Sequence, residues 1–100
     1  MKLNLVYSRR ANRDLADLYR YIALDQPDAA DRFRREIIAH CEILRDNPQL
    51  GVARSDLRKD VRIFSFKRRV AIAYVVTDDT IQILRVFYAG QDFETIIGGA

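Results

Sequence analysis

The periodicity of the apolar residues changes once along the chain, and this change limits the folds that the chain can adopt. Between residues 9 and 46, apolar side chains recur every three or four positions, as on one face of an α-helix. From residue 61 to residue 88, short runs rich in β-branched and aromatic residues follow one another, as expected of paired strands. The sequence therefore predicts an α+β domain whose helices cover one face of a small sheet.

The expected elements follow the order β-α-α-β-β-β, with a short helical tail. Ser8 can cap the first helix with its hydroxyl, and Pro27 suits the first turn of the second helix. This order predicts a helical hairpin packed on a mainly antiparallel four-stranded sheet. The expected strands are 3–7, 61–66, 69–77 and 80–88, the expected helices are 9–24 and 28–46, the expected loop is 52–60, and the tail includes Phe93, Ile96 and Ile97.

Tight turns are expected between the last three strands. The separators Lys67-Arg68 and Asp78-Asp79 are each two residues long, which is typical of β-hairpins. Aspartate tolerates the left-handed backbone that such turns require. The last three strands should therefore form an antiparallel meander.

Length and composition indicate a single domain that spans residues 1–100. The chain is 49% hydrophobic and 31% charged, as is usual for a globular domain. One cysteine and one histidine exclude a disulfide framework, a cysteine-based zinc finger and a histidine-rich metal site. No apolar run approaches the roughly 18 residues of a membrane span, and the N-terminus does not match a secretory signal. We expect a cytoplasmic protein that needs no metal, cofactor or membrane.

Positive charge is concentrated in the middle of the chain. The net charge is +3 overall, but residues 8–47 are balanced, residues 48–77 carry +5 and residues 78–100 carry −3. Such a block favours phosphate groups or an acidic protein partner. Alternatively, the cations protect a solvated strand edge against aggregation. The basic residues of this block are Arg54, Arg58, Lys59, Arg62, Lys67, Arg68 and Arg69.

An arginine lies within the apolar alternation of the last expected strand. Alternation would place Ile81, Ile83, Arg85 and Phe87 on one face of that strand. A buried charge without a partner is costly, so Arg85 must reach a carboxylate, a carbonyl group or a ligand. An internal pair with an acid such as Asp56 and a role in ligand binding are both compatible with the sequence.

The residues most often found in catalytic or metal sites have ordinary structural explanations here. His40 lies beside the apolar stripe of the second helix without a second histidine or a suitably spaced acid. Cys41 falls on that stripe and should be a small buried hydrophobic residue. The pair Asp14 and Asp17 lies near the start of the first helix, where acids favour the helix dipole. Glycine-rich phosphate loops and hydrolase motifs are absent from the sequence.

An ordered set of residues along almost the whole chain matches one known family. In the helical half these residues are Ser8–Ala11, Asp14-Leu15, Tyr21-Ile22, Pro27, Ala29-Ala30 and Arg32. In the remainder they are Pro48, Gly51, Arg54, Asp56-Leu57, Arg62, Tyr74, Ile83-Leu84-Arg85-Val86 and Asp92. On this basis the chain resembles the RelE/ParE superfamily of bacterial type II toxins and is most similar to ParE.

The resemblance implies a toxin that is held inactive by a cognate antitoxin of the ParD type, encoded by an adjacent gene. Toxin and antitoxin would form a hetero-oligomer. Characterised ParE toxins act on DNA gyrase and block replication, without being enzymes themselves. RelE-like relatives instead cleave mRNA on the ribosome. An inactive member that only binds the antitoxin is a third interpretation.

The residues available for catalysis help to distinguish a gyrase inhibitor from an mRNA endonuclease. Cleavage next to a 2′-hydroxyl requires a general base, a general acid and stabilisation of the charged phosphate. Arg62, Arg69 and Arg85 could stabilise the charge, and Tyr88 could act as the acid, at a position where many ParE sequences have histidine. A general base is missing, because residues 43–93 contain no glutamate and Lys59 or Lys67 would need a lowered pKa. The sequence therefore favours gyrase inhibition over endonuclease activity.

The sequence offers two surfaces for contact with the target or the antitoxin. One is the basic block, and the other is the segment 89–97, which carries Phe93, Ile96 and Ile97. The charge of the basic block favours acidic residues in the antitoxin. An antitoxin tail of this kind is commonly disordered and folds on the toxin.

Overall fold

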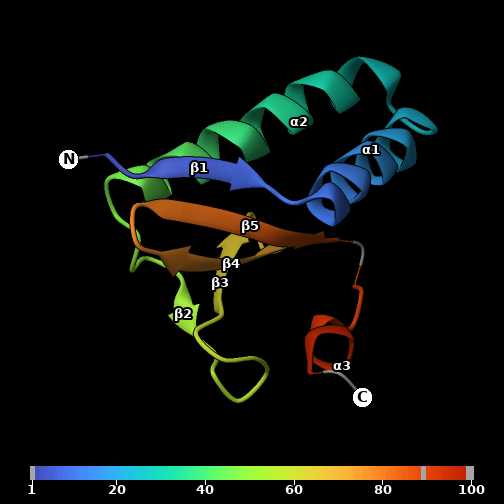
Figure 1. Cartoon of the computed structure of the whole chain (residues 1–100). Helices are drawn as coiled ribbons and strands as arrows, with labels where there is room; N and C mark the ends of the chain where they lie inside the picture. The colour runs from blue at the N-terminus through green and yellow to red at the C-terminus, as the bar shows by residue number, and fades with distance from the viewer. Residues whose placement is uncertain (1, 89, 99–100) are drawn as a thin grey trace.

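The helical hairpin expected from the sequence is present in the computed structural model, which describes residues 2–88 and 90–98. Helix α1 (Arg9–Ala23) and helix α2 (Pro27–Glu42) lie across one face of the sheet (Figure 1). The hydroxyl of Ser8 accepts a hydrogen bond from the Ala11 amide at 3.0 Å and so caps α1. Pro27 occupies the first turn of α2, where its missing N–H is not needed.

The sheet has five strands in the order β1-β5-β4-β3-β2. Strand β1 is parallel to β5, and the other pairs are antiparallel. This is one strand more than expected, because two residues of the expected loop 52–60 pair with β3. Periodicity cannot reveal a strand of two residues. The strands are β1 (Asn4–Tyr7), β2 (Val52–Ala53), β3 (Arg62–Phe66), β4 (Val70–Thr77) and β5 (Thr80–Phe87).

Most element boundaries differ from the sequence-based prediction by a single residue, and the end of the second helix differs by more. The second helix ends at Glu42, and a 3-10 turn, η1 (Ile43–Arg45), takes up most of its expected last turn. Strand β4 starts at Val70 instead of residue 69, because Arg69 belongs to the turn and donates its amide to the Phe66 carbonyl at 3.1 Å. The short C-terminal helix α3 (Phe93–Ile97) is present as expected.

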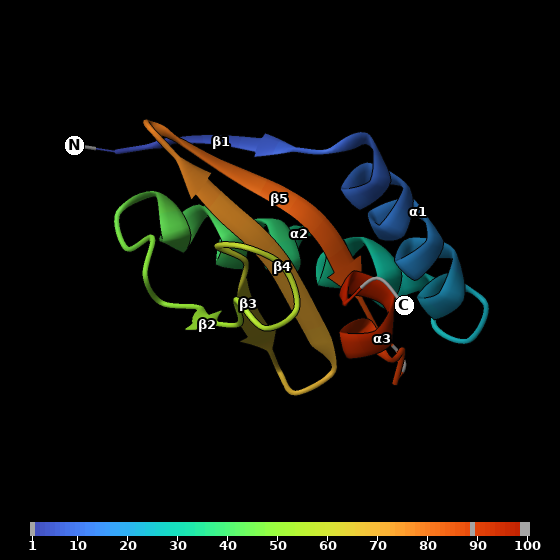
Figure 2. The ribbon, with the colours of Figure 1, turned by 60° about the horizontal axis from the view of Figure 1, so that its bottom comes forward.

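Apolar side chains form one cluster on each face of the sheet. Between the sheet and the helical hairpin lies the larger cluster, which includes Leu15, Leu18, Ile37, Ile72 and Tyr74. The smaller cluster lies on the opposite face, where α3 and the loop before β3 cover it (Figure 2). Its members are Val61, Ile63, Ala73 and Phe87, with Leu57, Phe93 and Ile97 packed against them. The tail residues Phe93 and Ile97 therefore have a structural role.

A bulge in β5 changes which residues face the helices. Tyr74 of β4 pairs with Ile83, and the preceding β4 residue, Ala73, pairs with Arg85. Leu84 therefore has no partner in β4 and is an extra residue in β5. Val86 therefore joins Ile83 in the helix-side cluster. The expectation that Ile83 and Phe87 share a face is wrong, because the bulge reverses the alternation between them.

Helix α1 holds this bulge through Ser8 and Asp14. The Ser8 hydroxyl donates to the Leu84 carbonyl at 2.8 Å. The Val86 amide donates to Asp14 Oδ2 at 2.9 Å, and Arg85 Nε donates to the same oxygen at 2.8 Å. Arg85 thus has the internal acidic partner that the sequence allowed, although the partner is Asp14.

The expected pairing of Arg85 with Asp56 is wrong. Asp56 lies in the loop before β3, where Arg54 forms two hydrogen bonds to its carboxylate at 3.0 Å. The bulge directs Arg85 towards α1, with its guanidinium carbon 4.7 Å from the centre of the Phe87 ring. Both aspartates are distant from Arg85 in the sequence, so the sequence alone could not show that Asp14 and not Asp56 is its partner.

Asp14→Ala should destabilise the protein by about 3 kcal/mol, because it leaves the Val86 amide and the Arg85 guanidinium without their partner in a nearly dry environment. Asp17→Ala is the matched control, since among the described residues Asp17 forms an ion pair only with Arg20, which is exposed and should contribute less than about 0.5 kcal/mol. Urea denaturation of both variants measures the two free energies of unfolding. Equal losses would contradict the structural role of Asp14.

Candidate functional site

A groove opens at the end of the molecule where the α1–α2 connection approaches the β3–β4 turn. Its volume is about 900 Å³. Leu18 and Ile22 of α1, Phe33 of α2 and Val70 of β4 supply apolar surface. An apolar floor of this kind favours the side chains of a protein partner.

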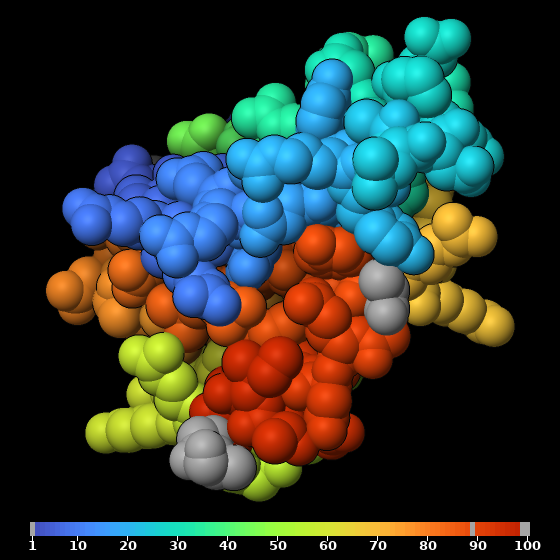
Figure 3. Space-filling model, turned by 90° about the vertical axis from the view of Figure 1, so that its right-hand side faces the viewer, coloured from blue at the N-terminus to red at the C-terminus, as the bar shows by residue number. Residues whose placement is uncertain are grey.

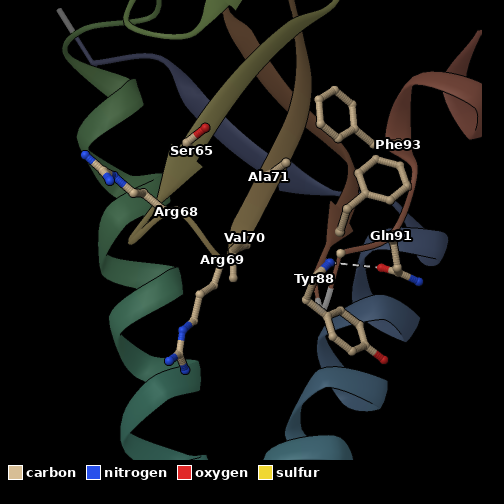
Figure 4. A pocket seen from close by; sticks show the side chains of 10 residues that line it. Ser65, Arg68, Arg69, Val70, Ala71, Tyr88, Gln91 and Phe93 are labelled. Atoms are coloured by element: carbon tan, nitrogen blue, oxygen red, sulfur yellow. Dashed lines mark hydrogen bonds between the residues drawn. The ribbon is translucent and has the colours of Figure 1, made fainter.

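A second, smaller hollow of about 200 Å³ adjoins the groove on the side of α3. Ser65, Ala71, Gln91 and Phe93 are among the residues that line it (Figure 4). The residues that line both hollows are Arg68, Arg69, Val70, Tyr88 and Gly90. The β3–β4 turn and the segment after β5 therefore border both.

The groove is predominantly basic at its rim. Arg32, Lys67, Arg68 and Arg69 line it, and Glu36 pairs with Lys67 at 3.3 Å. In the space-filling view of this end, side chains of the β3–β4 turn project outward beside the helices and the C-terminal segment (Figure 3). The other acidic residue in the lining is Asp25. Excess cations around an apolar floor would attract an acidic, amphipathic partner.

Four residues, Arg62, Arg69, Arg85 and Tyr88, form the catalytic set expected of a nuclease. Two of them, Arg62 and Arg85, form hydrogen bonds within the fold. Arg62 Nη1 donates to the Gly51 carbonyl at 2.7 Å, and Arg85 is bound to Asp14. The Tyr74 hydroxyl completes the support of the same loop, since it donates to the Pro48 carbonyl at 2.7 Å and accepts from the Gly51 amide at 2.9 Å. Neither Arg62 nor Arg85 lines the groove.

The structure brings the other two members of that set, Arg69 and Tyr88, into the groove lining. The Tyr88 ring lies 5.6 Å from the ring of Tyr21. Burial raises the pKa of Tyr88, and the carboxylates of Asp17 and Asp14 raise it further. The Tyr88 hydroxyl is therefore neutral at physiological pH and can donate a hydrogen bond.

The remaining candidates of the basic block lie around the loop before β3. Arg54 Nη2 donates to Glu94 of α3 at 2.8 Å and so joins this loop to the C-terminal helix. The same arginine holds the pKa of Asp56 below its usual range. Arg58 and Lys59 are exposed and line neither hollow.

Several lining residues were not selected as site candidates from the sequence. Leu24 is 88% exposed and Tyr21 is 57% exposed, although both continue the apolar pattern of α1. Arg32 and Phe33 join them from α2. One feature of the sequence could have indicated these residues. The apolar stripe of α1 continues to the end of the helix, beyond the length that a small sheet can cover, so its last residues are left exposed.

His40 and Cys41 have the structural roles expected of them. The His40 ring stacks on Phe64 with a centroid distance of 4.2 Å, and its Nε2 lies 3.0 Å from the Ser65 carbonyl oxygen. Cys41 is fully buried in the helix-side cluster. Among residues 2–88 and 90–98, no three His, Cys, Asp or Glu side chains are grouped as metal ligands. Over the same ranges, no helix is both long enough and apolar enough to span a bilayer.

Comparison with known proteins assigns the family. Residues 5–93 match the family described as the ParE toxin of the type II toxin-antitoxin system parDE. The chain belongs to the ParE toxin family. The resemblance on which the sequence analysis relied is thereby confirmed. Comparison with curated proteins gives no significant match.

Solved structures support the same fold for this ParE-family chain. A chain of the chromosomal ParDE toxin–antitoxin system of P. aeruginosa superposes with a TM-score of 0.77 at 23% identity, with 88% of this chain and 97% of that chain covered. The solution structure of a conserved hypothetical protein from Helicobacter pylori gives a TM-score of 0.55 at 19% identity and covers 89% and 97%. At these identities, the likeness establishes the α+β fold alone.

Cys41 should be almost inert to alkylation in the folded protein. Burial raises the pKa of its thiol to about 11, so at pH 8 the reactive thiolate is at least roughly 100-fold rarer than in the unfolded chain. The rate of modification by iodoacetamide at pH 8 should therefore be lower by at least this factor without urea than in concentrated urea. Similar rates in the two conditions would contradict the burial of Cys41.

Proposed function

We propose that this ParE-family chain is a toxin that inhibits DNA gyrase and is neutralised in the cytoplasm by a ParD-like antitoxin encoded by an adjacent gene. The observation that carries the proposal is the match to the ParE toxin family over residues 5–93. The engagement of Arg62 and Arg85 within the fold supports inhibition by binding, because only two of the four residues expected to be catalytic, Arg69 and Tyr88, then remain in the groove. Such a pair lacks a general base.

The chemistry of the groove supports an antitoxin as its occupant. Ile22, Leu24 and Phe33 would bury the apolar face of an amphipathic segment, and Arg32, Arg68 and Arg69 would attract its acidic residues. We propose that the antitoxin fills this groove in a toxin–antitoxin hetero-oligomer. The contact with gyrase would use the exposed cations Arg58 and Lys59 or the C-terminal segment with Ile96, which lie outside the groove.

An endonuclease that cleaves ribosome-bound mRNA is the alternative. It is favoured by one observation, namely that Arg69 and Tyr88 line the groove together. An inactive, antitoxin-binding member of the family is the remaining alternative. The effect of the toxin on growing bacteria distinguishes among these three.

Induction of the chain alone in bacteria should reduce incorporation of labelled thymidine within minutes, while incorporation of labelled amino acids continues. This order follows from gyrase inhibition, which stops replication before it affects translation. Immediate collapse of amino-acid incorporation would indicate the endonuclease instead. Unchanged growth at verified soluble expression would indicate an inactive member.

Co-expression with the product of the adjacent gene should yield a stable complex with a Kd in the nanomolar range or below. Calorimetry should show an affinity that falls as ionic strength rises, since exposed charge pairs at the rim are screened by salt. Failure to form a complex would contradict the antitoxin part of the proposal, whatever the outcome of the labelling experiment.

A further inference from the structure

The β3–β4 turn holds a lysine and an arginine in a backbone conformation that such residues rarely adopt. The φ angle is 51° at Lys67 and 58° at Arg68. A turn with positive φ at both central positions normally contains Asn-Gly or Asp-Gly, because the Cβ of other residues clashes with the backbone. Two adjacent non-glycine residues in this region are a source of strain.

The rest of the described chain satisfies the same requirement with tolerant residues. The other positive φ angles occur at Asp60, Asp78 and Gly90. Aspartate is enriched at positive φ, and glycine adopts it without strain. The β4–β5 hairpin has positive φ at Asp78 alone, so its turn carries less strain than the Lys67-Arg68 pair.

Contacts within the fold do not explain why basic side chains occupy the strained turn. Lys67 makes one exposed ion pair with Glu36 and lies 5.3 Å from the centre of the Phe66 ring. Among residues 2–88 and 90–98, Arg68 and Arg69 have no ion pair, and both line the groove. The Arg69 side chain extends towards the region between the two helices, whereas that of Arg68 points away from Tyr88 (Figure 4).

We propose that the Lys67-Arg68-Arg69 turn is a recognition element, held in a strained conformation so that its cations meet acidic side chains of the antitoxin segment in the groove. The proposal rests on the proposed function and adds that the strained turn itself, including Lys67, determines binding. A protein segment is favoured over a nucleic acid because Ile22, Leu24 and Phe33 offer apolar surface that a phosphate backbone cannot use.

The test compares three double variants. Lys67→Asn with Arg68→Gly installs a turn without strain and removes two charges. Arg68→Gln with Arg69→Gln removes two charges but retains the strain. Arg13→Gln with Arg34→Gln is the control for net charge, since both side chains are exposed on the helices and line neither hollow. Thermal unfolding of each isolated variant, and calorimetry with the adjacent-gene product, are the two readouts.

The Asn-Gly variant should unfold at a temperature roughly 4–8 °C higher than the unmodified protein, because the strain is relieved. It should nevertheless bind the antitoxin at least about tenfold more weakly, with a smaller dependence on salt. The Arg68/Arg69 variant should show the loss of binding without the gain in stability. The control should bind within about twofold of the unmodified protein.

The outcomes of these measurements distinguish failure of the recognition role of the turn from failure of the antitoxin proposal. If the unmodified protein binds the adjacent-gene product and the Asn-Gly variant binds it equally well, the recognition role of the turn is wrong and the proposed function stands. The recognition role is equally contradicted if the control loses as much affinity as the turn variants. If the unmodified protein does not bind at all, the antitoxin proposal fails and this inference fails with it. Binding of a duplex DNA at 150 mM salt that depends on Arg68 and Arg69, without such dependence for the antitoxin, would overturn the choice of a protein ligand.

Discussion

The carboxylate of Asp14 connects the two halves of the fold. It accepts hydrogen bonds from the Val86 amide and from Arg85, and thereby fixes α1 to the bulge in β5. Because the bulge reverses the alternation of β5, this contact also decides that Val86 faces the helices and Phe87 faces α3. Packing on both faces of the sheet therefore depends on one buried acid, whose partners would be costly to leave unpaired.

Four arginines of the predicted binding and catalytic sets divide into two groups by what they contact. Arg62 and Arg85 bind carbonyl and carboxylate oxygens within the fold, where they replace hydration lost on burial. Arg68 and Arg69 lie at the groove, and neither forms an ion pair with residues 2–88 or 90–98. A positively charged stretch of sequence can thus contain both arginines that stabilise the fold and arginines that line a groove. The three-dimensional structure is needed to tell the two kinds apart.

Periodicity predicted the order and type of almost all elements, because the stripes of α1 and α2 and the runs of β4 and β5 are long enough to be distinctive. It could not reveal β2, which consists of two residues, or the bulge at Leu84, which depends on contacts with Ser8 and Asp14 far away in sequence. The basic half of the groove rim was anticipated through the charge block. The apolar half was not, because exposure of Leu24 is a property of the assembled fold.

The brevity of β2 has a consequence for the behaviour of the free toxin. An exposed sheet edge can template pairing with other chains, and long flat edges promote aggregation. Here β2 is two residues long and pairs with Arg62 and Ile63 of β3, while at the other edge Arg45 exchanges hydrogen bonds with the backbone of Leu3, at 2.8 Å and 3.1 Å. These contacts shorten the exposed part of each edge, and so limit the length of backbone through which the free chain could pair with a second copy.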